Sequence, residues 1–153
     1  MREIREVIFR GKRTDNGEWV EGGYIPLDVD SGYTYIIEPC NYASSLPVLD
    51  LIKLHSILVI PKTIGQFTGL TDKNGTKIFE GDILKSTIKI IDFNDDEGFS
   101  ISHYDEELIG IVEWRRDGFM IAHKSGTWAR CFYGCENYVI GNIHDNPELL
   151  QKI

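Results

Sequence analysis

The sequence predicts an all-β protein with very little helix. Aromatic residues make up 11% of the chain, which suits strands better than a helical bundle. Short apolar runs recur along the chain, separated by tight-turn signals such as Asn16-Gly17 and Asn74-Gly75. Counting the runs gives about eight to ten short strands, a pattern typical of a small β-barrel or sandwich.

The first segment, residues 4–25, is predicted to form a β-hairpin. Apolar and charged residues alternate loosely up to Arg13, and Asn16-Gly17 supplies the turn. The returning strand holds Gly22-Gly23, which suggests a β-bulge. Beyond Pro26, the composition predicts strands over residues 33–38 and 56–60 and a short helix over residues 46–55.

The stretch from residue 64 to residue 84 is interpreted as the element that organises the chain. Asn74-Gly75 predicts a tight turn, and Glu80-Gly81-Asp82 predicts a second one. So many glycines indicate unusual backbone conformations that apolar neighbours hold in place. The structural motif predicted here comprises Gly65, Phe67, Gly69, Leu70, Asn74, Gly75, Phe79, Gly81 and Asp82.

The rest of the chain alternates strands and turns. Acidic turns are predicted at residues 94–98 and again at 105–107, and a hairpin turn at residues 115–118. Asn146-Pro147 predicts the start of a short terminal helix. The remaining strands are expected at residues 83–93, 99–104, 108–114, 119–122 and 138–140. We expect residues 1–60 to form an N-terminal β subdomain and residues 61–153 to form the second domain.

Composition indicates an intracellular, cytoplasmic protein with no membrane segment. No apolar run is long enough to span a bilayer, and the first residues lack the apolar core of a signal peptide. Three cysteines give no complete disulfide framework, as expected where thiols stay reduced.

The charge of the chain is −8, and it is unevenly distributed. Residues 92–107 contain seven acidic residues and no lysine or arginine, which leaves only −1 for the rest of the chain. An acidic surface repels phosphate backbones at long range. Binding of nucleic acid by the whole surface is therefore not favoured, although a local basic patch stays open.

Two stretches of the sequence contain partial metal-ligand patterns, and neither pattern is complete. Cys131 and Cys135, with His123 and His144, have a spacing that zinc pairs use, but a second clustered pair is missing. Residues 92–103 begin like a calcium loop but lack glycine and glutamate where that loop needs them. We therefore predict no metal and no cofactor.

A catalytic cluster is indicated just as weakly by the sequence. Glu80 and Asp82 beside His103 would provide acid–base groups, but acidic residues are common in turns. The chain has no nucleophile-elbow serine and no phosphate-binding glycine loop. We predict no catalytic residues and no enzymatic activity.

Exposed aromatic residues would offer a binding face. Trp114 is followed by Arg115 and Arg116, so this segment is the predicted binding face for a peptide or for single-stranded nucleic acid. Aromatic residues at strand positions more often belong to a core. The further aromatic candidates are Trp19, Tyr24, Tyr33, Tyr35 and Trp128.

The most distinctive stretches of the chain are IGQFTGLTDKNG at residues 64–75 with IFEGDI at 78–83, and VIGNIHDNPELL at 139–150. They closely resemble the signature of the YopX family of tailed bacteriophages and prophages. FRGK at residues 9–12, NGEWVEG at 16–22 and GIVEW at 110–114 add to it.

The resemblance implies an SH3-like barrel in the C-terminal half, assembly into homo-oligomers, and no established activity or catalytic residues. The first functional hypothesis is a non-enzymatic oligomeric module that binds an unidentified phage or host protein. The alternative is a β-barrel that binds single-stranded DNA or RNA.

Overall fold

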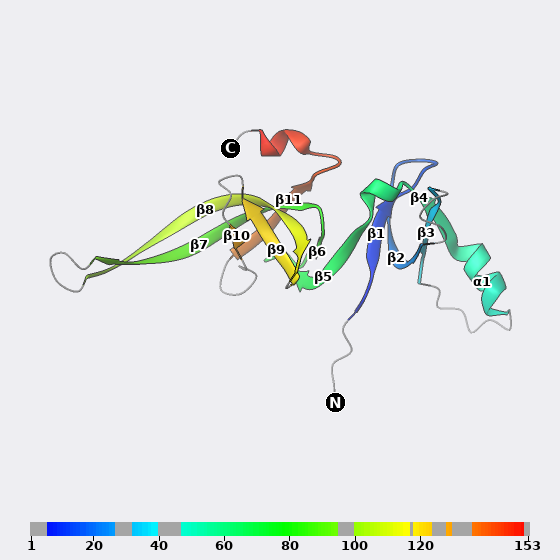
Figure 1. Ribbon diagram of the computed structural model, residues 1–153, viewed down its shortest axis with the longest axis horizontal. Helices are drawn as coiled ribbons and strands as arrows, with labels where there is room; N and C mark the ends of the chain where they lie inside the picture. The colour runs from blue at the N-terminus through cyan, green and yellow to red at the C-terminus, as the bar shows by residue number, and fades with distance from the viewer. Residues whose placement is uncertain are drawn as a thin grey trace, which may run out of the picture. The chain divides into compact units, whose positions relative to one another are not determined.

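A computed structural model describes residues 6–26, 32–39, 47–94, 100–116, 118–123, 128–129 and 136–151. The described chain is mainly β, with two antiparallel sheets and one short α-helix within those ranges (Figure 1). The all-β fold class is therefore confirmed. The strand orders are β4-β3-β2-β1-β5-β6 and β10-β9-β8-β7-β11.

The chain divides into two compact units, Met1–Gly69 and Leu70–Ile153. The division falls within β5 (Gly65–Thr71), so the first unit holds β1 to β4 and the start of β5. The expected boundary was after residue 60, just before the 3-10 helix η1 (Pro61–Thr63).

The first unit begins with the predicted hairpin, which is confirmed. Strand β1 (Phe9–Lys12) pairs antiparallel with β2 (Trp19–Pro26), and Gly17 in the turn between them has φ of 75°. The hairpin continues into β3 (Thr34–Ile37) and β4 (Ser56–Val59) through antiparallel ladders.

Gly22 and Gly23 do not form the predicted bulge. At this point β2 passes from pairing with β1 to pairing with β3, without a break in either register. A Cβ on Gly22 would lie 1.9 Å from the carbonyl oxygen of Ile37. Glycine is therefore needed here because a neighbouring backbone approaches closely.

One face of the first sheet carries the core of this unit. Val20, Ile36 and Val59 are buried there, with Ile57 and Ile64 packed against them. The end of β1 also meets β4, because the Ile60 amide donates to the Lys12 carbonyl at 2.8 Å. This contact curls the four strands around their apolar face.

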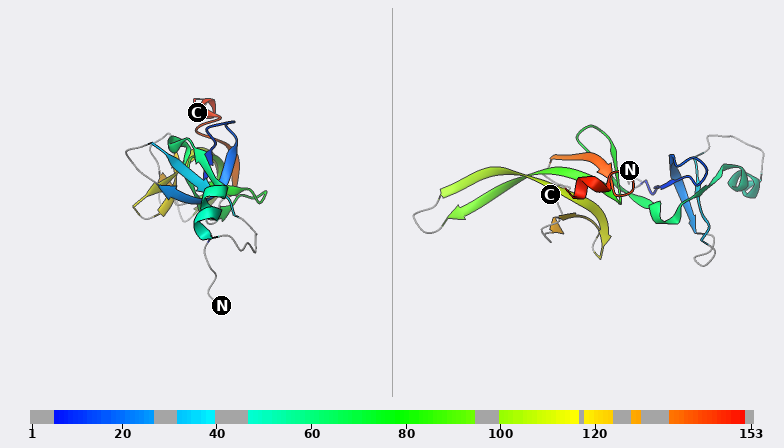
Figure 2. Two further views of the ribbon diagram at one scale, coloured as in Figure 1. Left: turned by 90° about the vertical axis from the view of Figure 1, so that its right-hand side faces the viewer. Right: turned by 90° about the horizontal axis from the view of Figure 1, so that it is seen from above.

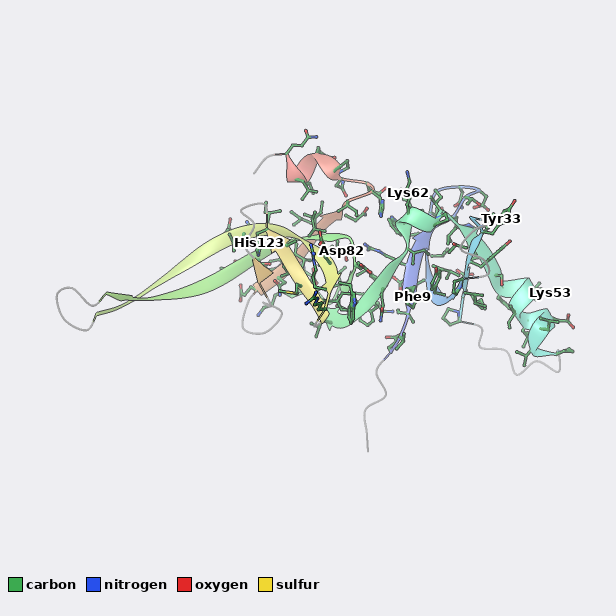
Figure 3. All side chains as sticks on the ribbon, in the orientation of Figure 1. Phe9, Tyr33, Lys53, Lys62, Asp82 and His123 are labelled. Atoms are coloured by element: carbon green, nitrogen blue, oxygen red, sulfur yellow. The ribbon has the colours of Figure 1, made fainter. Side chains whose placement is uncertain are left out.

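The only described α-helix, α1 (Val48–His55), confirms the helix expected over residues 46–55. None of its residues is buried, and Val48, Leu49 and Leu54 are each more than 60% exposed. Figure 3 shows Lys53 on this helix and Lys62 on η1.

The second unit is built on a five-stranded sheet. Its core contains Ile78, Leu84, Val112 and Ile121. The elements of the unit after β5 are β6 (Lys77–Phe79), β7 (Asp82–Asn94), β8 (Ser100–Arg115), β9 (Gly118–His123), β10 (Trp128–Ala129), β11 (Glu136–Asn142) and the 3-10 helix η2 (Pro147–Leu150).

The acidic turn predicted at residues 105–107 is wrong. These residues lie inside the continuous strand β8, in register with Lys89, Ile88 and Thr87 of β7. Opposite charges on neighbouring strands explain why acidic residues are tolerated there: Glu107 Oε1 lies 2.7 Å from Lys85 Nζ. The turn predicted at residues 94–98 mostly lies outside the described residues.

The SH3-like barrel expected for the C-terminal half is not confirmed. The strands described there form an open sheet rather than a closed barrel. The short terminal helix is confirmed as one turn of 3-10 helix, η2. Across the part of the chain that the structure describes, no helix is both long and apolar enough to cross a bilayer.

Candidate interaction surfaces

The turn between β5 and β6 is held by the buried carboxylate of Asp72. Its Oδ1 accepts hydrogen bonds from the amides of Asn74 and Thr76, both at 2.8 Å. Its Oδ2 accepts a bond from the amide of Val139 in β11 at 3.0 Å. One side chain thus shapes the turn and caps the outer edge of β11.

The pKa of Asp72 lies below its ordinary value. Burial by itself would raise this pKa, but hydrogen bonds from the backbone amides of Val139, Thr76 and Asn74 stabilise the ionised form and outweigh the burial. Asp72 is therefore a structural anion and not a proton donor near neutral pH.

A second turn joins β6 to β7 and also depends on an aspartate. Asp82 is only 1% exposed, and its Oδ2 accepts a hydrogen bond from the Phe79 amide at 2.8 Å. Gly81 has φ of 83°, and its carbonyl accepts a bond from the Ile143 amide at 2.9 Å. The labelled Asp82 lies where β7 begins (Figure 3).

The segment that follows β11 contains a third turn of this kind. Asn142 Oδ1 accepts hydrogen bonds from the amides of His144 and Asp145, each at 2.9 Å. A Cβ on Gly141 would lie 2.6 Å from the side chain of Asn146. This closing segment is therefore locked by close packing and local hydrogen bonds.

The residues of the predicted structural motif lie around these turns. Asn74 and Gly75 form the tip of the β5–β6 hairpin, where Gly75 has φ of 84°. Gly69 has φ of 87°, while Gly65 is buried in β5. Phe67 and Phe79 are buried, and Leu70 packs against the core of the second unit. The residues of the motif therefore serve turn geometry and packing.

The predicted face at Trp114, Arg115 and Arg116 is split by the strand. Trp114 pairs with Phe119, and the two rings meet edge to face with centroids 4.9 Å apart. Arg115 is the next strand residue and projects to the opposite face, where it forms a 2.9 Å ion pair with Glu113. Arg116 is exposed beyond the end of β8. The three residues therefore do not share one face.

The residues considered for catalysis are not brought together. Along β7, Asp82 lies nine residues from Ile91, the register partner of His103, a distance of about 30 Å. The buried His123, labelled in Figure 3, places its Nδ1 atom 3.3 Å from the carbonyl oxygen of Ile109. Cys131 and Cys135 lie outside the described residues, and the described side chains include no cluster of three potential metal ligands.

The far halves of β7 and β8 form a two-stranded ribbon. We define the ribbon as residues 88–94 of β7 and 100–106 of β8, which pair from Ile88↔Glu106 to Asn94↔Ser100. The ladder between β11 and β7 ends at Thr87, and the ladder between β9 and β8 begins at Gly110. Within the described residues, the ribbon therefore has no third strand on either edge, and it extends beyond β9 and β11 (Figures 1 and 2).

The first unit carries a second surface, on the face opposite its core. Register places Arg10, Lys12 and Trp19 together there, because Lys12 pairs with Trp19 and Arg10 with Glu21. The Arg10 guanidinium lies 4.7 Å and the Lys12 ammonium 5.6 Å from the centre of the Trp19 ring. Both are cation–π distances.

This grouping was missed at the sequence level, although its signal was present. Arg10 and Lys12 alternate on one strand, and the Asn16-Gly17 turn returns the chain so that Trp19 lies opposite Lys12. Counting register back from the turn would have put the two cations and the indole on one face.

Comparisons with known proteins extend over nearly the whole chain. The family model described as "YopX protein" matches residues 8–151. Among solved structures, the crystal structure of protein EF1440 from Enterococcus faecalis is 26% identical. That match covers 95% of this chain and 98% of that chain, with a TM-score of 0.43. No curated protein matches the chain.

Proposed function

The chain belongs to the YopX protein family, and on that premise we propose that it is a non-enzymatic interaction module that assembles with copies of itself. The ribbon is the observation that carries this proposal. An isolated two-stranded hairpin is marginally stable in water, and unpaired strand edges readily accept another chain. A partner that covers the ribbon would remove both disadvantages.

The proposal of a non-enzymatic role draws support from how several described acidic side chains are used. Asp72 and Asp82 are buried and accept backbone hydrogen bonds, so neither is placed to exchange a proton with a substrate. Arg115 is paired with Glu113, and Lys85 with Glu107. These groups support the fold rather than a reaction.

The wider setting follows from the resemblance. We place the protein in the cytoplasm of a bacterium that carries a phage or prophage, where it also binds an unidentified phage or host protein. We propose an SH3-like arrangement for the second unit on the basis of the resemblance. The strand order supports it only in that β11, the last strand, pairs with β7, the first strand of its sheet.

The test is size-exclusion chromatography with light scattering on the wild-type chain and on a ribbon-truncated chain. In the truncated chain, an Asn-Gly turn replaces residues 88–106 and joins the register partners Thr87 and Glu107. We expect a defined oligomer for the wild type and a folded monomer for the truncated chain. A wild type that stays monomeric at all concentrations tested would contradict the proposal.

The same runs include short single-stranded and duplex oligonucleotides at low salt. Because the chain has a net charge of −8, which repels phosphate backbones, we expect no complex with nucleic acid. A complex that dissociates as salt rises would instead support the nucleic-acid alternative. The Trp114→Ala variant would then test whether that segment is the site.

A further inference from the structure

We propose that the ribbon of one copy docks on the outer face of the first unit of a second copy. The outer face is defined as the side of β1 to β4 opposite Val20, Ile36 and Val59. This inference rests on the proposed self-assembly and names the surface that receives the ribbon. Register places on it Arg10, Lys12, Trp19, Glu21, Gly23, Ile25, Tyr35, Ile37, Ser56 and Leu58.

The outer face combines apolar contact area with positive charge. Trp19, Tyr35 and Leu58 are half-buried, so each still presents part of its side chain to solvent. Arg10 and Lys12 lie over the Trp19 ring at 4.7 and 5.6 Å, which holds two cations at one end of the face. Glu21 is the single acidic residue among these strand positions.

The ribbon has the complementary composition. Its sequence contains apolar residues together with three acidic residues, Asp92, Asp105 and Glu106, against one cation, Lys89. Neither edge is covered by another strand in the described parts of the chain. The apolar side chains of the outer face can pack against the apolar residues of the ribbon, and its cations can pair with the acidic residues of the ribbon.

The charge distribution favours a second copy over a nucleic acid. The chain as a whole has a charge of −8, so long-range repulsion opposes phosphate backbones. Within the ribbon, Asp92, Asp105 and Glu106 outnumber Lys89, and a cationic patch on another copy attracts such an acidic segment. Because the two contacting surfaces differ, the interface is heterologous, and repetition of it builds a ring or an open chain.

The experiment exchanges charges between the two surfaces. Lys12→Glu reverses one cation of the outer face, and Asp105→Lys with Glu106→Lys reverses the charge of the ribbon. We expect each variant alone to assemble with a dissociation constant raised about tenfold or more, measured by light scattering and sedimentation. An equal mixture should assemble again, because every contact between unlike variants then pairs opposite charges.

Matched controls separate this pairing from general charge effects. Lys62→Glu changes an exposed lysine of the same unit outside the outer face, and Glu148→Lys changes an exposed acid of the second unit outside the ribbon. Both should assemble like the wild type. Far-UV circular dichroism checks that each variant is folded, and Lys12→Gln replaces Lys12→Glu if the latter unfolds.

The outcomes distinguish the two proposals. If truncation of the ribbon abolishes assembly but Lys12→Glu does not, the docking surface is wrong and self-assembly through the ribbon stands. If the mixture of the two variants fails to assemble, the direct charge pairing is overturned. A monomeric wild type that binds single-stranded DNA through Lys12 would assign the outer face to nucleic acid and overturn this inference.

Discussion

The two halves of β7 share one strand but differ in their surroundings. Residues 82–87 pair with β11, and from Ile83 onward they also pair with β8 on the other side. Asp82, Ile83, Leu84 and Ser86 are buried. Residues 88–94 pair with β8 only. The near half is thus an internal strand of a sheet, and the far half belongs to a two-stranded hairpin that no third described strand covers. The comparison teaches that the burial and pairing that stabilise the sheet are concentrated in one half of a single strand, and that the other half is free to serve the self-assembly we propose.

Leu84→Ala should lower the free energy of unfolding most, because it removes core packing from the near half of β7. Leu84 has no exposed surface and belongs to the core cluster with Ile78, Val112 and Ile121. Removing a buried leucine side chain costs about 3 kcal/mol. Urea unfolding of the variant should show this loss in the free energy of unfolding, and a loss below about 1 kcal/mol would contradict the assigned core.

Asp72→Asn should destabilise the chain by about 2 kcal/mol at neutral pH, because backbone amides would then face a side chain with one acceptor instead of two. The folded-state pKa of Asp72 is lowered, so its contribution is complete above the unfolded pKa of about 4 and is lost as pH falls through the lower, folded value.

The difference in unfolding free energy between wild type and Asp72→Asn should therefore narrow below about pH 4. Asp15→Asn is the control. The pKa of the Asp15 carboxylate is also lowered, to about 2, by its hydrogen bond from Arg13, but this carboxylate is exposed and lies in a surface ion pair. If the difference in unfolding free energy between wild type and Asp72→Asn stays constant down to pH 2, the structural role assigned to the ionised form is contradicted.

Gly81→Ala should cost about 1–2 kcal/mol, because an alanine at φ of 83° is strained. The nearest atoms to its added Cβ belong to Ile143 at 3.6 Å, so backbone strain rather than a clash is the cause. Gly23→Ala is the matched control, since nothing lies within 4 Å of its added Cβ and its φ is not positive. Thermal melts that show equal losses for both would argue against strain.

Truncation of the ribbon should have the smallest effect on stability, less than about 1 kcal/mol, because a hairpin without a third strand contributes little to the fold. The measurement is urea unfolding at concentrations where both chains are monomeric. A large loss would show that the far half of β7 supports the near half, and the contrast between them would disappear.

Local signals in the sequence predicted much of the fold. The Asn16-Gly17 and Asn74-Gly75 turns, the strands β3 and β4, and helix α1 lie where composition placed them. The length of β8 was not predictable in this way. The acidic residues 105–107 suggest a turn when read alone, and only their register with Lys89, Ile88 and Thr87 of β7 shows that they belong to a strand.

The candidate surfaces were harder to predict because they depend on pairing. Trp114 and Arg115 are adjacent in sequence, but the pleat sends them to opposite faces. Arg10 and Trp19 are nine positions apart, and a hairpin places the Arg10 guanidinium 4.7 Å from the centre of the Trp19 ring. The hydrogen bond from Val139 to Asp72 joins residues 67 positions apart, so nothing local in the sequence indicates it.

The pairing of β11 with β7 also sets the order in which the second unit is completed during synthesis. As the chain leaves the ribosome, β7 and β8 meet early, because they are neighbours in sequence. The edge of β7 that β11 will cover stays open until residue 142 has emerged. During that interval the nascent chain exposes two adjacent lengths of unpaired strand edge, and among the described strands only β11 later covers one of them, the near one.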